Sequence, residues 1–518
     1  MKVVLTADRT NMLNHKVFFL TGFLATVPRE VIHPVVRPIC ESVVFSKPPS
    51  NGREATLALY GMRKIEAALI EADVPVEVVP WNKLDEIDKV DVFGVSAMDP
   101  LGCGPATTTA RMFLGGTPYN RYYFEKLIDK LREFQKPIIV GGSGAWQFEV
   151  FPEEQDRLGI DCVLVGDGEE AAPQVFRMAT TGNKLPKIVH SSQPSRIPLI
   201  KKPAYWGFVE VSRGCDRACQ FCDPAMKKFR WMSLDHILEE VKVNLRFQNG
   251  VTLHSEDVFR YGCRHGEWKP NGKLINLFRA VRHVGARWIV ITHGTLSSAH
   301  SSPELIGEMA KLMKTNPEDY AGVQVGLETG STRLIAKYMR GKALPYTPEE
   351  WPSIASQAFE LLTENRIIPA ATLIIGLPGE TAEDVDQTIE LVKQLEKYPS
   401  MIVPLAFVPL GLLRKQHFPK ELKSDAYIKL YSTCARHNAY WTRTFSRHWQ
   451  GRMALGPDFI AHIGAMLMWK GAEAMEARRN VSQLRVAAWA TQETALFLAH
   501  RAEATIKNNK WVLELATH

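Results

Sequence analysis

Long hydrophobic runs, blocks of like charge and repeated cysteine pairs are all scarce in this 518-residue sequence. The apolar run at residues 17–27 is only about half as long as a membrane span, so we expect a buried strand and turn there and no transmembrane segment. The 63 Lys and Arg are interleaved with 56 Asp and Glu. This weak excess does not point to a nucleic-acid partner. The N-terminus has no hydrophobic core with a cleavage site, so no secretory signal is expected.

Cysteine is also sparse, with eight residues in the whole chain. Five of them are scattered, namely Cys40, Cys103, Cys162, Cys263 and Cys434. Such a pattern in a long chain does not resemble a disulfide framework. A reducing cytoplasm therefore fits the sequence better than an oxidising compartment.

What the sequence does contain is an alternation of short apolar runs and amphipathic stretches. A chain of this length is expected to form two or three domains. In residues 1–190 we predict strands at the N-terminus and near 90–96, 136–141 and 160–166, with helices near 56–72 and 122–134. This order predicts a Rossmann-like parallel α/β sheet domain. Gly142 and Gly166 follow strands, where a glycine serves a ligand or a tight turn equally well.

The Ser- and Pro-rich residues 191–203 read as a linker. A second strand–helix series follows in residues 204–415. Its strands are expected near 206–211, 251–254, 288–292, 322–327, 370–375 and 402–408, with a helix near 233–247 capped by Ser233. Six parallel strands of this kind make a partial or full TIM-like (β/α) barrel. Residues 416–518 are predicted to be helical, with segments at 425–442, 459–477 and 481–507.

The chemistry is concentrated in Cys215, Cys219 and Cys222, on a loop after the first of these strands. Three cysteines at such spacing are typical of a metal or iron–sulfur site. A structural zinc site needs four ligands, and no second CxxC or HxxxH is nearby. Three thiolates on a [4Fe–4S] cluster leave one iron open to bind a small molecule.

This cysteine loop, with Phe221 before the last cysteine, resembles the radical S-adenosylmethionine (SAM) superfamily. Three further sites in residues 204–415 are similar to the same family: Glu256 after the second strand, Glu328 in the fourth, and Gly376 in Gly-Leu-Pro-Gly-Glu-Thr after the fifth. The resemblance implies that Glu256 faces the amino group of SAM, Glu328 the ribose and Gly376 the adenine. Thr372 stands where the family often has glycine.

The resemblance also implies a reaction. The reduced cluster cleaves SAM to a 5′-deoxyadenosyl radical, which attacks carbons that no base could deprotonate. An external electron donor of the flavodoxin or ferredoxin type is then required. No side chain has to act as an acid or base, so the sequence names no catalytic residue.

The N-terminal region resembles the domain that precedes the barrel in cobalamin (B12)-binding radical SAM enzymes. The similarity lies in the 136–144 strand, the segment Asp161-Cys-Val-Leu-Val-Gly-Asp-Gly-Glu-Glu and the order of the parts. The Asp-x-His-x-x-Gly motif of many B12 proteins is missing, as it is from several members of this class. Cobalamin-dependent methylation or radical carbon–carbon bond formation is therefore the expected activity. The substrate is expected to be a small molecule or a lipid, and peripheral membrane contact is compatible with it.

Two alternatives stay open at this point. A methylthiotransferase acting on tRNA or a ribosomal protein would hold a second cluster on Cys40, Cys103 and Cys162, although such enzymes end in a small β-domain and this C-terminus is predicted helical. A cluster-bearing electron-transfer module without SAM chemistry is the other. The Trp and Met residues of the C-terminal segment suit plain core better than a substrate channel.

Overall fold

The computed structural model describes residues 1–14, 22, 24–35, 37–181, 184–314, 319–419, 424–449 and 473. Its first unit is a fully parallel sheet in the order β4-β1-β5-β6-β7-β8. The strands are β1 (Val3–Thr6), β4 (Val76–Val78), β5 (Val92–Ser96), β6 (Ile138–Gly141), β7 (Cys162–Gly166) and β8 (Ile188–Ser191). The four predicted strands are confirmed, and β4 and β8 add an edge strand on each side.

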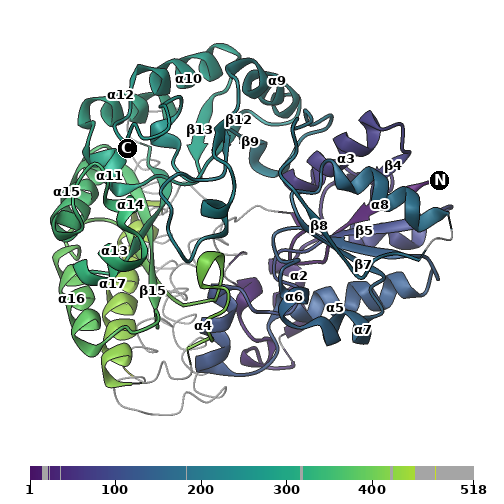
Figure 1. Ribbon diagram of the computed structural model, residues 1–518, viewed down its shortest axis with the longest axis horizontal. Coiled ribbons are helices and arrows are strands. Elements are labelled where there is room, and N and C mark those ends of the chain that lie inside the picture. The colour runs from purple at the N-terminus through teal and green to yellow at the C-terminus, as the bar shows by residue number, and fades with distance from the viewer. Residues whose placement is uncertain are drawn as a thin grey trace, which may run out of the picture.

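Helices cover both faces of this sheet because its strands are apolar on both sides. Val92 packs in one core cluster with α3 (Tyr60–Glu71) and α8 (Ala171–Thr180), whereas its neighbour Phe93 packs in the opposite cluster with α5 (Tyr119–Arg132). Figure 1 shows the two sets of helices on opposite sides of the strands. The fold class of this region is therefore Rossmann-like, as predicted.

Shorter elements complete the region. They are η1 (Arg29–Val31), α2 (Arg37–Val44), the hairpin β2 (Ser50–Asn51) and β3 (Glu54–Ala55), η2 (Trp81–Glu86), α4 (Pro105–Leu114), α6 (Gln147–Val150) and α7 (Pro152–Leu158).

Six further parallel strands form a partial barrel, as predicted. They are β9 (Phe208–Glu210), β12 (Gly250–His254), β13 (Trp288–Ile291), β14 (Ala321–Glu328), β15 (Ile367–Ile375) and β16 (Met401–Ala406). Two three-stranded sheets, β9-β12-β13 and β14-β15-β16, are joined by a parallel bridge between His293 and Gln324. Figure 1 shows them curving together, with helices on the outside.

The outer helices and the connections of the barrel follow the chain. They are η3 (Tyr205–Gly207), β10 (Ser212–Arg213), η4 (Asp223–Met226), β11 (Arg230–Trp231), α9 (Leu234–Leu245), η5 (Val258–Arg260), α10 (Gly272–His283), α11 (Leu296–His300), α12 (Pro303–Met313), α13 (Thr332–Tyr338), α14 (Arg340–Ala343), η6 (Pro348–Glu350), α15 (Trp351–Glu364), α16 (Ala382–Gln394) and η7 (Gly411–Leu413). Ser233 caps α9 as predicted, because its side chain accepts a hydrogen bond from the His236 amide.

The barrel strands alternate between buried and half-buried residues. In β15, Leu373 and Ile375 are buried in the outer core, whereas Thr372 and Ile374 are only half-buried. Such alternation separates the face of a barrel strand that meets the helices from the face that meets the interior. Thr372 therefore faces the barrel interior.

The N-terminal region contacts both edges of the partial barrel. Beside the first strand, the Tyr205 amide donates to the Ala58 carbonyl at 2.9 Å, and Lys64 forms a buried ion pair with Glu240 at 2.5 Å. At the last strand, the Ala406 amide donates to the Thr109 hydroxyl of α4 at 2.8 Å. The gap between β9 and β16 is thus bordered by the Rossmann-like region on both sides.

Two predictions at the ends of the chain need comment. The strand expected at 17–27 is wrong, since its described residues 24–26 are helical. Helix α17 (Asp425–Trp449) confirms the helix expected at 425–442, whereas those expected at 459–477 and 481–507 lie outside the described residues apart from residue 473. Among the helices described, none is both long and apolar enough to cross a bilayer.

Candidate functional site

The cysteine loop leaves the first barrel strand and is folded tightly on itself. It runs from β10, which pairs with β11, to η4. The Cys215 amide donates to the Pro224 carbonyl at 3.0 Å, and the Cys222 amide donates to the Cys219 carbonyl at 3.2 Å. The Cys219 side chain is buried, the other two are half-buried, and all three are free thiols.

Two glycines from distant parts of the chain press against this loop. A Cβ atom on Gly341 of α14 would overlap the carbonyl oxygen of Arg217, and one on Gly411 would lie 2.6 Å from the carbonyl oxygen of Gln220. The Gly411 amide donates to Asp223 at 2.9 Å. The backbone of α14 and η7 thus holds the cysteine loop from outside, in a space that admits no side chain.

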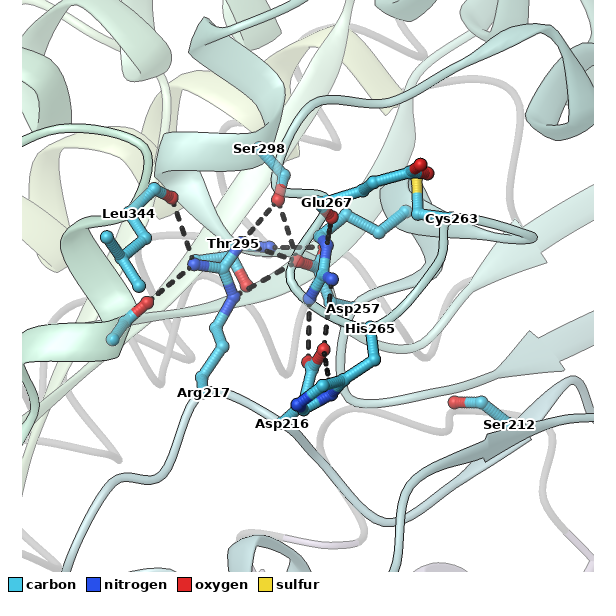
Figure 2. Close-up of polar contacts among 12 residues, drawn as sticks. Ser212, Asp216, Arg217, Asp257, Cys263, His265, Glu267, Thr295, Ser298 and Leu344 are labelled. Atoms are coloured by element: carbon cyan, nitrogen blue, oxygen red, sulfur yellow. Dashed lines mark hydrogen bonds and ion pairs between the residues drawn. The ribbon is translucent and has the colours of Figure 1, made fainter.

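Buried ion pairs hold the loop from beneath (Figure 2). Arg217, only 3% exposed, donates to Asp257 at 3.0 Å and to Ser298 at 2.6 Å. It also donates to the carbonyl oxygens of Gly341 and Leu344 at 2.8 and 3.1 Å. These contacts join the cysteine loop to the ends of three other barrel strands.

Burial disfavours the charged form of all three cysteines. It raises the pKa of Cys219 and Cys222, and that of Cys215 to about 12. The Glu256 carboxylate raises the pKa of Cys222 further. A cation is therefore needed to convert these thiols to thiolates, and a bound metal does this.

The donor set suits a cluster better than a single ion. Within the described residues, no three His, Cys, Asp or Glu side chains gather closely enough to hold one metal ion. A [4Fe–4S] cluster instead binds each thiolate through a different iron. Three buried thiols on one short loop fit that group, with Phe221 half-buried against the barrel core beside them.

The two predicted carboxylates lie at strand ends near the loop. Glu256 follows β12 and acts electrostatically on both Cys215 and Cys222. Glu328 ends β14, where it is 6% exposed with φ of +62°. Its carboxylate also receives a hydrogen bond from Thr372 at 3.5 Å. The structure therefore brings these three residues to the same end of the barrel.

Lys342 is a site residue that the sequence did not reveal. Its ammonium lies 2.6 Å from Glu328 and is almost completely shielded from solvent. Burial alone would lower the pKa of Lys342, but the nearby Glu328 carboxylate and Cys219 outweigh this and raise it. Lys342 therefore stays charged beside the cysteine loop. Its sequence neighbourhood, Arg-Gly-Lys in a short helix, carries no signal of this role.

Gly376 lies where β15 turns into the next loop, with φ of +84°. Its amide donates to Glu380 at 2.6 Å, and Tyr427 of α17 donates to the same carboxylate at 2.8 Å. Burial raises the pKa of Glu380 to about 7. The described start of the C-terminal segment thus touches the loop that carries Gly376.

A pair of histidines at the ends of neighbouring strands was also missed. His254 ends β12 and His293 follows β13, with ring centroids 6.0 Å apart. Burial lowers the pKa of both, that of His254 to about 4. His254 contacts the Thr292 hydroxyl at 3.0 Å, and Nδ1 of His293 is buried without a hydrogen-bond partner. Both imidazoles are therefore neutral at pH 7.

In the N-terminal sheet, the structure gives the predicted glycines a packing role. A Cβ on Gly142 would lie 2.7 Å from the carbonyl oxygen of Ala97, and one on Gly166 would overlap that of Ser191. Both residues are nonetheless exposed on one side, as is Met98 beside them. The carboxyl ends of these strands therefore offer bare backbone and an exposed thioether to a ligand.

One arginine connects this sheet to the cysteine loop. Arg213, two residues before Cys215, lies 2.8 Å from Glu169, 3.3 Å from Asp167 and 2.7 Å from Glu210. Lys227, beyond the cysteines, contacts Asp167 at 2.5 Å. Asp167 and Glu169 belong to the Gly-Asp-Gly-Glu-Glu segment after β7. That segment thus binds both flanks of the cysteine loop.

Comparison with curated proteins finds several relatives at low identity. Two are tRNA-2-methylthio-N(6)-dimethylallyladenosine synthases: that of Thermosipho africanus is 24% identical, over 53% of this chain and 61% of the relative, and that of a Sulfurihydrogenibium species is 27% identical, over 52% and 62%. The ribosomal protein uS12 methylthiotransferase RimO of Carboxydothermus hydrogenoformans is 28% identical, over 47% and 57%. The chain spans less than two thirds of each.

Comparison with solved structures finds a shared fold. TsrM of Kitasatospora setae, a radical S-adenosylmethionine methyltransferase with cobalamin and a [4Fe-4S] cluster bound, aligns with a TM-score of 0.51 at 16% identity, over 80% of this chain and 73% of that one. Its structure with tryptophan and a SAM analogue gives the same TM-score at 14% identity, over 80% and 74%. The match extends beyond the barrel, which supports the α/β architecture as a whole.

The family comparison is specific to the barrel. Residues 209–392 match the radical SAM superfamily, and this segment holds the cysteine loop, Glu256, Glu328 and Gly376. A [4Fe–4S] cluster and SAM are the cofactors that this family implies. Through residues 209–392, the chain belongs to the radical SAM superfamily.

Proposed function

We propose that this chain is an enzyme that cleaves SAM reductively and functionalises an unactivated carbon of a small-molecule or lipid substrate. The observation that carries the proposal is the cysteine loop, packed at the carboxyl ends of the barrel strands beside Glu256 and the Glu328–Lys342 pair. Cys215, Cys219 and Cys222 hold the cluster. When bound, the cluster supplies the electron that cleaves SAM.

The chain's own residues bind and orient SAM. The carboxylate of Glu256 accepts hydrogen bonds from its ammonium group, and that of Glu328 accepts them from the ribose hydroxyls. Lys342 keeps Glu328 ionised, because the buried pair is only 2.6 Å apart. Gly376 borders the adenine through exposed backbone. The barrel interior excludes water and thiols from the reaction.

His254 and His293 are suited to hold the substrate rather than SAM. Both are neutral and lie on strands next to Glu256. The unpartnered Nδ1 of His293 is costly in a buried site, and a polar group of the substrate would satisfy it. This places a hydrogen-bonding group of the substrate near the second and third barrel strands.

We further propose that the Rossmann-like region binds cobalamin and that the reaction is a methylation. The shared fold with TsrM, whose structure contains cobalamin, supports this reading. So do the exposed backbone at Gly142 and Gly166 and the exposed Met98, which lie where parallel sheets bind ligands. Bound there, cobalamin would supply the methyl group. Radical carbon–carbon bond formation is the other reaction that this arrangement serves.

A methylthiotransferase is the second candidate, and the names of the curated relatives favour it. Since several of those relatives are named for tRNA, the expectation that nucleic acid is not a partner finds no support. The structure supplies no second cluster for this candidate. Cys103 and Cys162 belong to core clusters on opposite faces of the sheet, and Cys40 lies on α2. We therefore rank it below methylation.

The proposal includes the organisation of the chain. We assign residues 1–190 to the cobalamin-binding domain, 191–203 to a linker, 204–415 to the radical SAM barrel and 416–518 to a helical C-terminal domain. We place the enzyme in the cytoplasm, where reducing conditions preserve free thiols and an electron donor of the flavodoxin or ferredoxin type is at hand.

Anaerobic reconstitution tests the cluster. About four irons per chain are expected, and they should be lost in the Cys215→Ala/Cys219→Ala/Cys222→Ala variant but kept in Cys40→Ala. About eight irons per chain, reduced by Cys40→Ala, would favour the methylthiotransferase. Stoichiometric zinc in place of iron would refute the proposal.

Product analysis then tests the reaction. With SAM and dithionite, the wild type should release 5′-deoxyadenosine or S-adenosylhomocysteine, and a reduced chain that yields neither is an electron-transfer module. Cobalamin should co-purify and survive the triple cysteine change, because its proposed contacts lie in the other region. A chain that never retains cobalamin under saturating supply contradicts the methylation proposal.

A further inference from the structure

A hollow of about 300 Å³ lies on the outer side of the cysteine loop. Its floor includes Ala218 and Gln220, the two residues that flank Cys219. The Ala218 side chain is exposed, whereas Cys219 is buried. The hollow is therefore separated from a proposed cluster ligand by the thickness of the loop itself.

The floor of the hollow is rigid. The Gln220 amide donates to the Tyr338 carbonyl, and the Gln220 side chain donates to the Lys337 carbonyl, both at 2.9 Å. Arg217, beneath Ala218, makes the buried contacts with Asp257 and Ser298 shown in Figure 2. A surface held in this way can meet a partner without reordering, so little conformational entropy is lost on binding.

Exposed cations border the hollow on two sides. Lys337 and Arg340, on α13 and α14, form one wall. The loop that carries Trp268 forms the other, and it holds Arg264, His265 and Lys269, all exposed. The surface is thus rich in positive charge on both sides of the floor.

The nearby carboxylates offset little of that charge. Asp216 lies 2.8 Å from Arg260, and this pair is almost fully buried (Figure 2). Glu267 is exposed beside Arg264 but does not line the hollow. Glu349 and Glu350 lie beyond α14 on η6 and do not line it either. The net field at the floor is therefore positive.

We propose that this hollow is the docking site of a small acidic protein that delivers electrons one at a time. The inference rests on the proposed cluster behind Cys219. In each encounter, the reduced donor loses one electron and the cluster gains one, and no bond is made or broken. Complementary charge accelerates such encounters, and the thin floor keeps the transfer distance short. A nucleic acid would be drawn by the same charge, but a compact hollow over a buried thiol suits a donor better than an extended backbone.

The test compares Lys337→Glu/Arg340→Glu with Lys89→Glu/Lys126→Glu, which reverses two exposed charges on the N-terminal region instead. The probe is a purified acidic flavodoxin, reduced before mixing, and the readout is bleaching of the cluster's visible absorbance in stopped flow. Reduction of the first variant should slow about 10-fold or more at low salt. The control pair should react like the wild type.

Three further measurements make the result specific. Salt should slow the wild type and barely affect Lys337→Glu/Arg340→Glu, since screening removes the same attraction. Dithionite, a small reductant, should reduce both variants at the wild-type rate, which also shows that their clusters are intact. The Lys337→Arg/Arg340→Lys variant should restore the flavodoxin rate.

The outcomes separate this inference from the proposed function. Equal flavodoxin rates in all variants would overturn the docking site and leave the proposed function standing. Loss of bulk tRNA binding in Lys337→Glu/Arg340→Glu, with flavodoxin reduction unchanged, would assign the hollow to RNA instead. A wild-type cluster that flavodoxin reduces through this surface, but that never cleaves SAM, would refute the enzyme and keep the docking site. A chain without a cluster refutes both.

Discussion

The two sheets of this protein use glycine and charge at the same place, beyond the carboxyl ends of parallel strands, but in different ways. In the Rossmann-like region, Gly142 and Gly166 let neighbouring strands close upon each other. In the barrel, Gly341 and Gly411 come from remote elements and press on the cysteine loop. The first arrangement shapes a surface for a ligand, and the second fixes a loop that carries ligands of its own.

The contrast predicts different responses to substitution. Changes that loosen the cysteine loop should affect iron content, whereas changes in the N-terminal sheet should affect cobalamin alone. Arg213 is the exception, since it belongs to both regions. The four predictions below proceed from the largest expected effect to the smallest.

Arg213→Met should cause the largest loss. Three carboxylates surround this side chain, which is 11% exposed, and removing its charge leaves them in a buried site without their shared cation. Loss of one partner from such a site typically costs about 3–5 kcal/mol. Denaturant unfolding measures the effect. Arg157→Met, which removes an exposed arginine with two carboxylate partners, is the control, and its cost should stay within about 1 kcal/mol. Equal losses in the two variants would mean that Arg213 does not couple the regions.

Glu380 should make stability depend on pH. Its pKa is raised from 4.5 to about 7 in the fold by burial, so between these values the folded chain binds more protons than the unfolded chain. Stability should therefore fall as the pH rises from 4.5 to 7, by up to about 3 kcal/mol, and then level off. In Glu380→Gln this fall should disappear, which melting curves from pH 5 to 8 would reveal. Glu383→Gln, an exposed neighbour, should keep the wild-type profile.

Gly341→Ala should loosen the cysteine loop directly. The added methyl group would overlap the Arg217 carbonyl, and overpacking of this kind costs about 1–3 kcal/mol. Iron retained after reconstitution and desalting should fall with it. Gly61→Ala is the matched control, because Gly61 lies in a helix with open space around its Cα. If Gly341→Ala held its iron as firmly as Gly61→Ala, the outer clamp would not matter for the cluster.

Thr109→Ala should have the smallest effect. It removes the hydroxyl that accepts a hydrogen bond from Ala406 across the edge of the barrel, worth about 1 kcal/mol. Thr109→Ser should restore the melting temperature. A larger loss, with iron released, would show that the edge of the barrel matters as much as the loop that carries the cysteines.

The sequence predicted the elements whose signals are local. All six barrel strands are marked by runs of β-branched and apolar residues, and Ser233 is a capping residue at a helix start. The short edge strands β4 and β8 were missed because three or four residues carry too little pattern. The strand expected at 17–27 failed because a short apolar run does not distinguish a strand from a helix.

The site shows the same limit. Glu256 and Glu328 were found because they follow strands inside recognisable motifs. Lys342 lies 14 residues after Glu328 and meets it only when α14 folds back over the barrel. Arg213 meets Asp167 and Glu169 across a linker. Pairs of this kind are made by tertiary packing, and no local pattern records them.

The clamp on the cysteine loop also has a consequence for the order in which the protein is made. Gly411 follows Cys222 by nearly the whole length of the barrel, so a ribosome exposes the three thiols long before it releases the element that closes over them. The Rossmann-like region, by contrast, is complete before the first of these cysteines is synthesised, and domains fold in that order during translation. Until the last strand emerges, the thiols are open to iron, to zinc and to oxidants alike. Metal insertion into this protein is therefore a race against the end of its own synthesis.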